Sequence, residues 1–246
     1  MDNALDLRKI REALPYGTHI LVKEVTASTN DDLKALSLSE TFSRPVVLIA
    51  KEQTAGRGRQ GRSFFSKGGL YMSVLFPSLG EEASFLTHIA AVAVAEAVRA
   101  ETGRPALVKW VNDVYLSGKK VCGILAESIL RDNMRSYVLG IGVNVGTGDI
   151  PLALRDTMAF FEGDKTALAA VILEDIFRRI SSFDLSSLRA EYASLSFLTG
   201  RRVTVVEGEK KRPAEVLGLS EKLGLLVRYD DGNEEELIAG EVHLLL

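Results

Sequence analysis

Apolar residues recur at three- and four-residue spacing in two long segments, a pattern typical of amphipathic helices. One segment is 84–101, which includes Leu86, Ile89 and Val98, and Gly103 ends its pattern. The second is 165–182. Shorter helices are predicted over 2–14, 31–38 and 185–195. We interpret the helix over 84–101 as structural.

Short runs of alternating or continuous apolar residues predict strands in the rest of the first two hundred residues. They cover 19–25, 45–50, 70–76, 106–116, 120–128 and 135–145. The last three are joined by short turns at 117–119 and 131–133. Strands joined by such short turns must be antiparallel. Ser28 or Asn30 can cap the helix over 31–38, and capping alone would explain Ser28 and Thr29.

The pattern changes after residue 199, which indicates a second domain. Five short strand-like runs follow within fifty residues, at 202–206, 214–219, 225–229, 235–238 and 242–245. Glycine-containing turns separate them, and this density of short strands is typical of a small barrel. We therefore divide the chain into domains 1–197 and 198–246.

The segment KEQTAGRGRQGR, residues 51–62, stands out as a cationic, glycine-rich loop between two predicted strands. Its three glycines are Gly56, Gly58 and Gly61, and its three arginines are Arg57, Arg59 and Arg62. Glycine lets a backbone approach a ligand closely, and arginine suits phosphate and carboxylate. The loop is therefore a candidate lid over an anion, with a solvated surface loop as the alternative.

The glycines also spell G-x-G-x-x-G, the fingerprint of dinucleotide-binding folds. That motif requires a helix to begin at the loop, so that its N-terminus faces the pyrophosphate. Here a strand over 70–76 is predicted next, and the variable positions are largely arginines. We therefore reject the dinucleotide-binding interpretation.

Polar residues interrupt the predicted antiparallel strands, where burial without partners is costly. They are Lys109, Asn112, Asp113 and Lys120. Either they pair with one another at the strand ends, or they line a polar cleft. Gly140 and Gly142 indicate close approach of a backbone or ligand.

Composition narrows the function classes. The formal net charge of −3 provides no general attraction to nucleic acid. The single cysteine, Cys122, excludes an internal disulfide and a cysteine-rich zinc site, and the three histidines are far apart in sequence. No secretory h-region or bilayer-spanning apolar run is evident, so we expect a soluble cytoplasmic protein that does not bind membranes.

Several of these pieces together resemble the biotin protein ligases. They are the Ser28, Thr29 and Asn30 run, Gln53 with GRGRQGR, VKWVNDVYLSGKKVCGIL, LGIGVN and the terminal barrel. The resemblance extends from about residue 18 to the C-terminus. It implies an α+β fold, with a mixed sheet and helices like those of class II aminoacyl-tRNA synthetases, plus a small SH3-like C-terminal β-barrel.

The resemblance also implies a two-step reaction. Biotin and ATP form biotinyl-5′-AMP and pyrophosphate, and a lysine of a biotin carboxyl carrier protein then attacks the mixed anhydride. The implied substrates and cofactors are thus biotin, ATP and Mg²⁺.

By the same resemblance, individual residues receive roles. The expected biotin-binding residues are Ser28, Thr29, Asn30, Gln53, Arg57, Gly58, Arg59, Lys120, Gly123 and Gly140. The expected ATP-binding residues are Arg59, Arg62, Lys109, Asn112, Asp113 and Asn144. Lys120, Arg57 and Arg59 are the expected catalytic residues, and Asp113 is the carboxylate expected to hold Mg²⁺.

The sequence departs from the family pattern in two places. Val111 stands where proline is common, and Phe64 stands where tryptophan is common. The stretch before the first strand is too short for a helix-turn-helix domain, so we expect a monofunctional ligase that does not bind DNA. A homodimer is one assembly that the resemblance allows.

Two alternatives stay open. One is a lipoate protein ligase, which shares the superfamily and chemistry, although GRGRQGR argues against it. The other is a non-enzymatic module that binds nucleic acid or protein through the basic loop and the barrel. That module would not need Lys109, Asn112, Asp113 and Lys120, and its barrel has few aromatic residues for base stacking.

Overall fold

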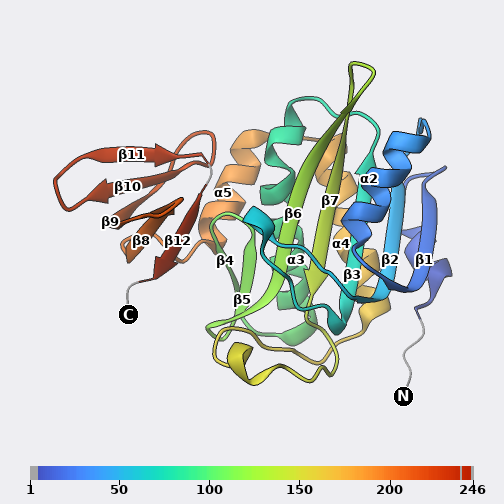
Figure 1. Cartoon of the computed structure of the whole chain (residues 1–246), viewed down its shortest axis with the longest axis horizontal. Helices are drawn as coiled ribbons and strands as arrows, with labels where there is room; N and C mark the ends of the chain where they lie inside the picture. The colour runs from blue at the N-terminus through green and yellow to red at the C-terminus, as the bar shows by residue number, and fades with distance from the viewer. Residues whose placement is uncertain (1–4, 239, 245–246) are drawn as a thin grey trace.

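The structure is a computed structural model that describes residues 5–238 and 240–244, and it contains two β-sheets. The large sheet has seven strands in the order β1-β2-β3-β7-β6-β5-β4, and the small sheet lies beside its β4 end (Figure 1). The strands of the large sheet are β1 (His19–Thr26), β2 (Val46–Gln53), β3 (Lys67–Phe76), β4 (Ala106–Lys109), β5 (Asp113–Leu116), β6 (Lys119–Arg131) and β7 (Met134–Val143).

The large sheet is mixed, because β1 and β2 are parallel and every other neighbouring pair is antiparallel. Helix α2 (Thr29–Ser39) makes the crossover that a parallel pair requires. β3 pairs with β7, so that Met72 lies opposite Ile141. The predicted mixed α+β class is confirmed. This order also brings three segments far apart in sequence, around residues 50, 70 and 140, into one sheet.

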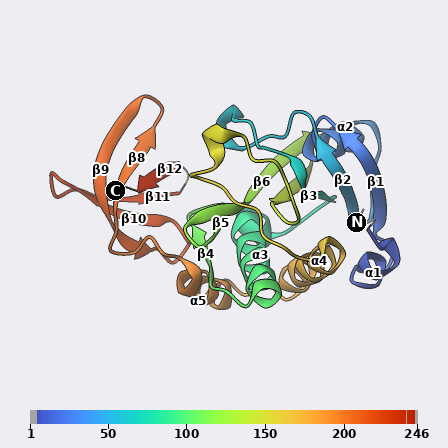
Figure 2. The ribbon, with the colours of Figure 1, turned by 90° about the horizontal axis from the view of Figure 1, so that it is seen from below.

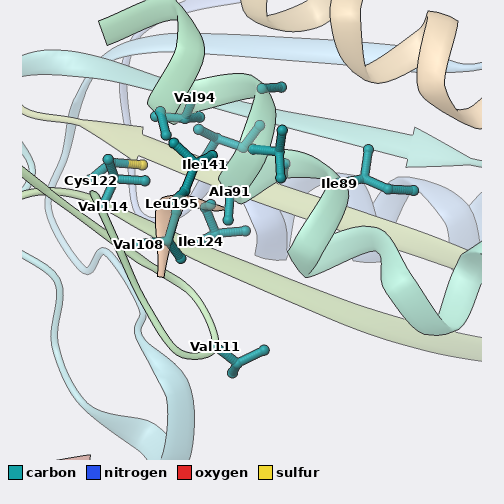
Figure 3. Packing of buried hydrophobic residues seen from close by; sticks show 14 of the residues in the cluster. Ile89, Ala91, Val94, Val108, Val111, Val114, Cys122, Ile124, Ile141 and Leu195 are labelled. Carbon is teal, nitrogen blue, oxygen red and sulfur yellow. The ribbon is translucent and has the colours of Figure 1, made fainter. Parts of the chain in front are cut away.

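Helices cover both faces of the large sheet. On one face lie α1 (Leu7–Glu12), α3 (Leu86–Thr102), α4 (Lys165–Ser181) and α5 (Leu185–Leu195), whereas α2 lies on the other (Figure 2). Figure 3 shows the main core, where Ile124 and Ile141 of the sheet approach Ala91 and Val94 of α3. The continuous apolar run of α3 is therefore buried on most of its circumference.

Helix ends agree with their local chemistry. The carboxylate of Asp164 accepts from the backbone N–H groups of Thr166 and Ala167 at the start of α4, and Asp184 does the same for α5. Gly103 ends α3 at φ +64°, a left-handed conformation that glycine adopts without strain. α1 is shorter than the predicted helix over 2–14, and residues 2–4 lie outside the described residues.

One helix meets the length and composition of a membrane span, although no such run was evident from the sequence. Residues 81–102 form a helical segment with a mean hydropathy of 1.3, long and apolar enough to cross a bilayer. Of its apolar window, 61% is buried inside the fold, where α3 packs against α4 and the sheet. The core helix of a compact domain has the same composition.

The single strand predicted over 106–116 is also wrong. The chain turns at residues 110–112, and β4 and β5 form an antiparallel hairpin in which Lys109 pairs with Asp113. The turn places the Trp110 indole inward, 4% exposed, and its Nε1 donates to the Leu223 carbonyl at 3.0 Å. The polar residues that interrupt the apolar run therefore mark a hairpin turn.

The small sheet is antiparallel, with strand order β11-β10-β9-β8-β12. Its strands are β8 (Arg202–Glu207), β9 (Lys210–Leu219), β10 (Leu225–Tyr229), β11 (Glu234–Leu237) and β12 (Glu241–Leu244). All five predicted strands are present, although residue 245, the predicted end of the last one, lies outside the described residues. The sheet contacts the rest of the chain near Trp110 and Leu223.

His88 of α3 is a buried histidine near this contact. Burial lowers its pKa to about 4; the Leu223 carbonyl opposes the shift and the charge of Arg59 adds to it. Neither ring nitrogen makes a directed hydrogen bond, so the Leu223 carbonyl is close but poorly aligned. Protonating His88 thus places an uncompensated charge in the core.

We predict a pH dependence of stability from His88. Because burial depresses the pKa of His88 in the folded state, its full contribution to the free energy of unfolding is present above about pH 6.5. That contribution, about 3 kcal/mol, is lost as the pH falls toward 4. Urea unfolding between pH 4.5 and 8 should show this slope, and His88→Gln should flatten it. Exposed His19→Gln is the control; equal slopes in all three proteins would contradict the prediction.

Candidate functional site

A cavity of about 960 Å³, open mouth included, lies on the α2 side of the large sheet. Its walls come from the start of α2, the end of β2, the basic loop, the β4–β5 turn, β6 and β7. The small sheet adds Gly240 and Val242. Fourteen of the predicted site residues line it, namely Ser28, Thr29, Asn30, Gln53, Arg57, Gly58, Arg59, Arg62, Lys109, Asn112, Asp113, Lys120, Gly123 and Gly140.

The floor of the cavity is a strip of glycines on β6 and β7. Gly140 and Gly142 are two residues apart on one strand and so share a face, and Gly123 pairs with Gly142. A Cβ would lie 2.2 Å from Asn30 Oδ1 at Gly140 and 2.3 Å from the Phe64 ring at Gly142. The sequence predicted close approach of a backbone or a ligand at these glycines, and the structure instead places two side chains there.

A compact polar cluster occupies one end of the cavity. Gln53 Oε1 accepts from the Thr29 backbone N–H at 2.8 Å and lies 3.1 Å from Thr29 Oγ1. The buried Ser73 hydroxyl lies 2.7 Å from both Thr29 Oγ1 and Asn30 Oδ1. Asn30 Nδ2 donates to Glu127 and Leu125, and Gln53 Nε2 donates to Ser66, so both amide orientations are determined.

This cluster has fewer hydroxyl protons than short oxygen–oxygen contacts. Three short contacts join the hydroxyls of Thr29 and Ser73 to each other and to the amide oxygens of Gln53 and Asn30. The two hydroxyls carry two protons, so one contact brings two oxygens together with no proton between them. The cluster therefore has an excess of acceptors and favours a ligand that donates N–H groups.

Ser28 acts as the helix cap that the sequence suggested. Its Oγ accepts from the Asp31 backbone N–H at 3.4 Å at the start of α2. Asn30 lies inside the helix, so the alternative of an Asn30 cap is wrong. Capping orients the first turn of α2, which points Thr29 and Asn30 into the cavity.

The opposite end of the cavity is charged. Lys120 Nζ lies 2.7 Å from Asp113 Oδ1 and 5.7 Å from the centre of the Phe64 ring. Asp113 Oδ1 is buried, and no donor is aligned with it for a hydrogen bond, so the contact is ionic. Asn112 Nδ2 donates to the Ile124 carbonyl at 2.9 Å. The predicted polar set therefore both pairs internally and lines the cavity.

The basic loop closes the side of the cavity between β2 and β3. Arg57 Nε lies 2.8 Å from Asp31 Oδ2, and the Gly58 N–H donates to the Arg62 carbonyl at 2.7 Å. One short 3₁₀ turn, Arg59–Gly61, lies within the loop, and β3 follows it. No α-helix begins there, which agrees with the rejection of the dinucleotide motif.

Asn144 is the predicted site residue that the structure does not bring to the cavity wall. It is 1% exposed; its backbone N–H donates to Val121 and its carbonyl accepts from Phe161. Its Oδ1 is buried without a hydrogen-bond partner. Its visible contacts join the end of β7 to β6 and to the segment around residue 161.

No group of three or more His, Cys, Asp or Glu side chains among residues 5–238 and 240–244 is arranged to hold a metal ion. Asp113 offers a single carboxylate at the cavity. Any divalent cation there would need most of its oxygen ligands from a substrate or water, as Mg²⁺ at phosphate sites usually has.

Comparisons with known proteins agree on one family. The model of the biotin/lipoate A/B protein ligase family matches residues 22–144. A biotin--[acetyl-CoA-carboxylase] ligase of Mycobacterium tuberculosis is 34% identical over 198 residues, covering 73% of this chain and 71% of that protein. The chain belongs to the biotin/lipoate A/B protein ligase family.

Further relatives point the same way. The bifunctional ligase/repressor BirA of Bacillus spizizenii is 35% identical over 166 residues, and the match spans 63% of this chain but only 51% of that relative. A biotin protein ligase from Aquifex aeolicus, solved in complex with biotin and ATP, superimposes with a TM-score of 0.78 at 31% identity, covering 92% of this chain and 98% of the other.

Some residues around the site of this family member were not predicted from its sequence. Trp110, Gln60 and Ser63 line the cavity, as do the small-sheet residues named above. Ser73 and Glu127 contact lining residues from β3 and β6. A serine within the apolar run of β3 was the one visible signal, because a buried hydroxyl needs a partner.

We predict that the glycine floor positions the loop. Gly142→Ala would place a methyl group against the Phe64 ring and displace the loop from the sheet. Limited proteolysis should then cleave within residues 57–63 at least about tenfold faster. A decrease of about 1.4 kcal/mol in the free energy of loop opening is enough to raise the open population tenfold. In a Phe64→Leu background the same change should add little, and unchanged cleavage in Gly142→Ala would contradict the role of Phe64.

Proposed function

We propose that the protein is an ATP-dependent biotin protein ligase. It joins biotin to ATP as biotinyl-5′-AMP and transfers biotin to one lysine of a biotin carboxyl carrier protein. The observation that carries the proposal is the excess of acceptors in the cluster of Thr29, Asn30, Gln53 and Ser73. The ureido ring of biotin supplies two N–H donors, whereas the dithiolane ring of lipoate supplies none.

The two ends of the cavity fit the two ends of biotin. With the ureido ring at the acceptor cluster, the carboxylate reaches toward Lys120 and Asp113. There the carboxylate oxygen attacks the α-phosphorus of ATP and pyrophosphate leaves. The ammonium of Lys120 offsets the charge of two anions that otherwise repel and stabilises charge that develops on the phosphoryl oxygens. Asp113 holds Lys120 in place.

Mg²⁺ is part of the proposal, with Asp113 as its protein ligand. Asp113 supplies the carboxylate at this end of the cavity, and a carboxylate suits a hard cation that takes its other ligands from phosphate and water. When bound, the ion neutralises phosphate charge. Lys109, Asn112 and Arg62 lie at the same end and are proposed to contact the nucleotide, with Asn144 as an indirect support.

The basic loop is proposed to shield the adenylate. Arg57 and Arg59 would contact its phosphate, and closure keeps water from the mixed anhydride. In the second step the carrier lysine, in its neutral amine form, attacks the anhydride carbonyl carbon and AMP leaves with the phosphate oxygen. The new bond is an amide, and the amine loses one proton to solvent or a base.

We further propose the domain division and its likenesses. Residues 1–197 form a catalytic domain like class II aminoacyl-tRNA synthetases, and residues 198–246 form an SH3-like barrel. The five antiparallel strands β8–β12 support the second likeness. A soluble cytoplasmic enzyme that binds neither DNA nor membranes remains a prediction, as does its state of assembly.

The test of the function compares two acids. The purified protein with ATP and Mg²⁺ should release pyrophosphate with biotin and label a carrier domain at one lysine. It should do neither with lipoate. Release with lipoate alone would establish the lipoate protein ligase instead. Release with neither acid would favour the non-enzymatic binding module.

The test of the charged end is Lys120→Ala. Loss of one electrostatic group at a developing charge lowers a rate by about 10²–10³. Pyrophosphate release should fall by that order, while the affinity for biotin changes less. Lys119→Ala is the matched control, because Lys119 lies on the same strand but donates to the Arg155 carbonyl on the surface. Near-normal release from Lys120→Ala would assign Lys120 a structural role.

A further inference from the structure

Glu127 uses both of its carboxylate oxygens beside the cavity without lining it. Oε2 accepts from Asn30 Nδ2 at 2.8 Å, and Oε1 accepts from Lys34 Nζ at 2.7 Å. Its side chain is 27% exposed. The carboxylate is therefore held from two sides, by the first turn of α2 and by a lysine one turn further along.

This arrangement allows the Asn30 amide a single orientation. Its NH₂ group faces two acceptors, the Glu127 carboxylate and the Leu125 carbonyl at 3.3 Å. Rotating the amide by half a turn would place its oxygen against both. Asn30 Oδ1 therefore faces Ser73, where it completes the acceptor excess of the cluster.

Lys34 keeps Glu127 in place and remains charged. Its Nζ also lies 2.9 Å from Asp31 Oδ1. Burial alone lowers the pKa of Lys34, but the hydrogen bonds to Glu127 and Asp31 outweigh burial, so the pKa is raised. The donor to Glu127 Oε1 is therefore an ammonium group, which has no acceptor to offer in exchange.

We propose that Glu127 is a positioning residue for ligand specificity. Through the Asn30 amide it keeps the polar cluster one hydroxyl proton short, so an oxygen of the cluster is left to accept an N–H group of the ligand. The inference rests on the proposed function, in which the ureido ring of biotin is the donor. Glu127 itself touches no ligand in this account.

The first variant, Glu127→Gln, should remove the acceptor excess. Its oxygen stays with the Lys34 ammonium, so its NH₂ group faces the NH₂ group of Asn30. Two donors cannot bond, so the Asn30 amide turns over to accept from the introduced NH₂ group, and it gives up its longer bond to the Leu125 carbonyl. Asn30 then donates to Ser73, Ser73 to Thr29 and Thr29 to Gln53, which satisfies the cluster without a ligand. The affinity for biotin should fall by about 10- to 100-fold, the cost of leaving buried polar groups unmatched.

The second test exchanges the carboxylate of Glu127 with the amide of Asn30. In Asn30→Asp alone, two carboxylates face each other, and biotin binding should weaken again. In the double variant Asn30→Asp with Glu127→Gln, the introduced amide NH₂ donates to the introduced carboxylate, and the amide oxygen still accepts from Lys34. The second oxygen of that carboxylate accepts from Ser73, so the acceptor excess returns while the total charge stays unchanged. The affinity of the double variant for biotin should recover most of the loss of either single variant.

Isothermal titration with biotin gives the first readout, and thermal unfolding checks that each variant is folded. Glu96→Gln is the matched control, because Glu96 pairs with Arg99 on the exposed side of α3. At saturating biotin the KM for ATP should change far less than the affinity for biotin, since Asn30 and Glu127 bond to Leu125, Ser73 and Lys34 rather than to the charged end. A double variant as weak as the worse single variant, or Glu127→Gln binding biotin like Glu96→Gln, would overturn the proposal.

A second readout does not depend on biotin. The side-chain NH₂ signals of Asn30 in a ¹⁵N-labelled sample are identified by their loss in Asn30→Ser. They should shift strongly in Glu127→Gln and stay in place in Glu96→Gln. Unshifted signals would refute the positioning role even if the wild type binds biotin, and a wild type that ignores biotin would refute the proposed function with the positioning role intact.

Discussion

The site depends on the absence of side chains from one patch of sheet. Gly123, Gly140 and Gly142 leave the central strands bare on the cavity face, and both Asn30 and Phe64 occupy the space that a Cβ would take. On the other face the same strands contribute large apolar residues to the core. Because side chains alternate along a strand, β6 and β7 pack against the core on one face and form the cavity floor on the other.

The chemistry of the cavity is segregated along its length. At one end amides and hydroxyls form a neutral cluster, and at the other an ammonium and a carboxylate form an ion contact. Segregation of this kind aligns an elongated ligand with one polar neutral end and one anionic end.

A line of ionic and hydrogen-bonded contacts runs from Arg57 of the loop through Asp31, Lys34 and Glu127 to Asn30. Loop and floor therefore share one set of contacts.

Much of the fold and of the cavity could be predicted from the sequence, because short local patterns determine these features. The loop glycines, the Ser28 cap of α2 and the five strands of the small sheet are encoded within a few residues each. The β4–β5 hairpin was missed, since the run over 106–116 is apolar enough for one strand and its turn is formed by buried Trp110. Glu127 was missed because its partners lie more than ninety residues away on α2, and they meet it only when that helix packs on the sheet.

The walls of the cavity extend along the chain from residue 28 to residue 242, and both sheets contribute to them. A ligand that fits it therefore meets its full set of contacts only after the distant pairing of β3 with β7 and the docking of the small sheet at Trp110. Binding free energy then adds to the free energy of folding of both sheets together. Detaching the small sheet from a loaded chain would cost the ligand its contacts with Gly240 and Val242, so occupancy couples the stability of the two sheets.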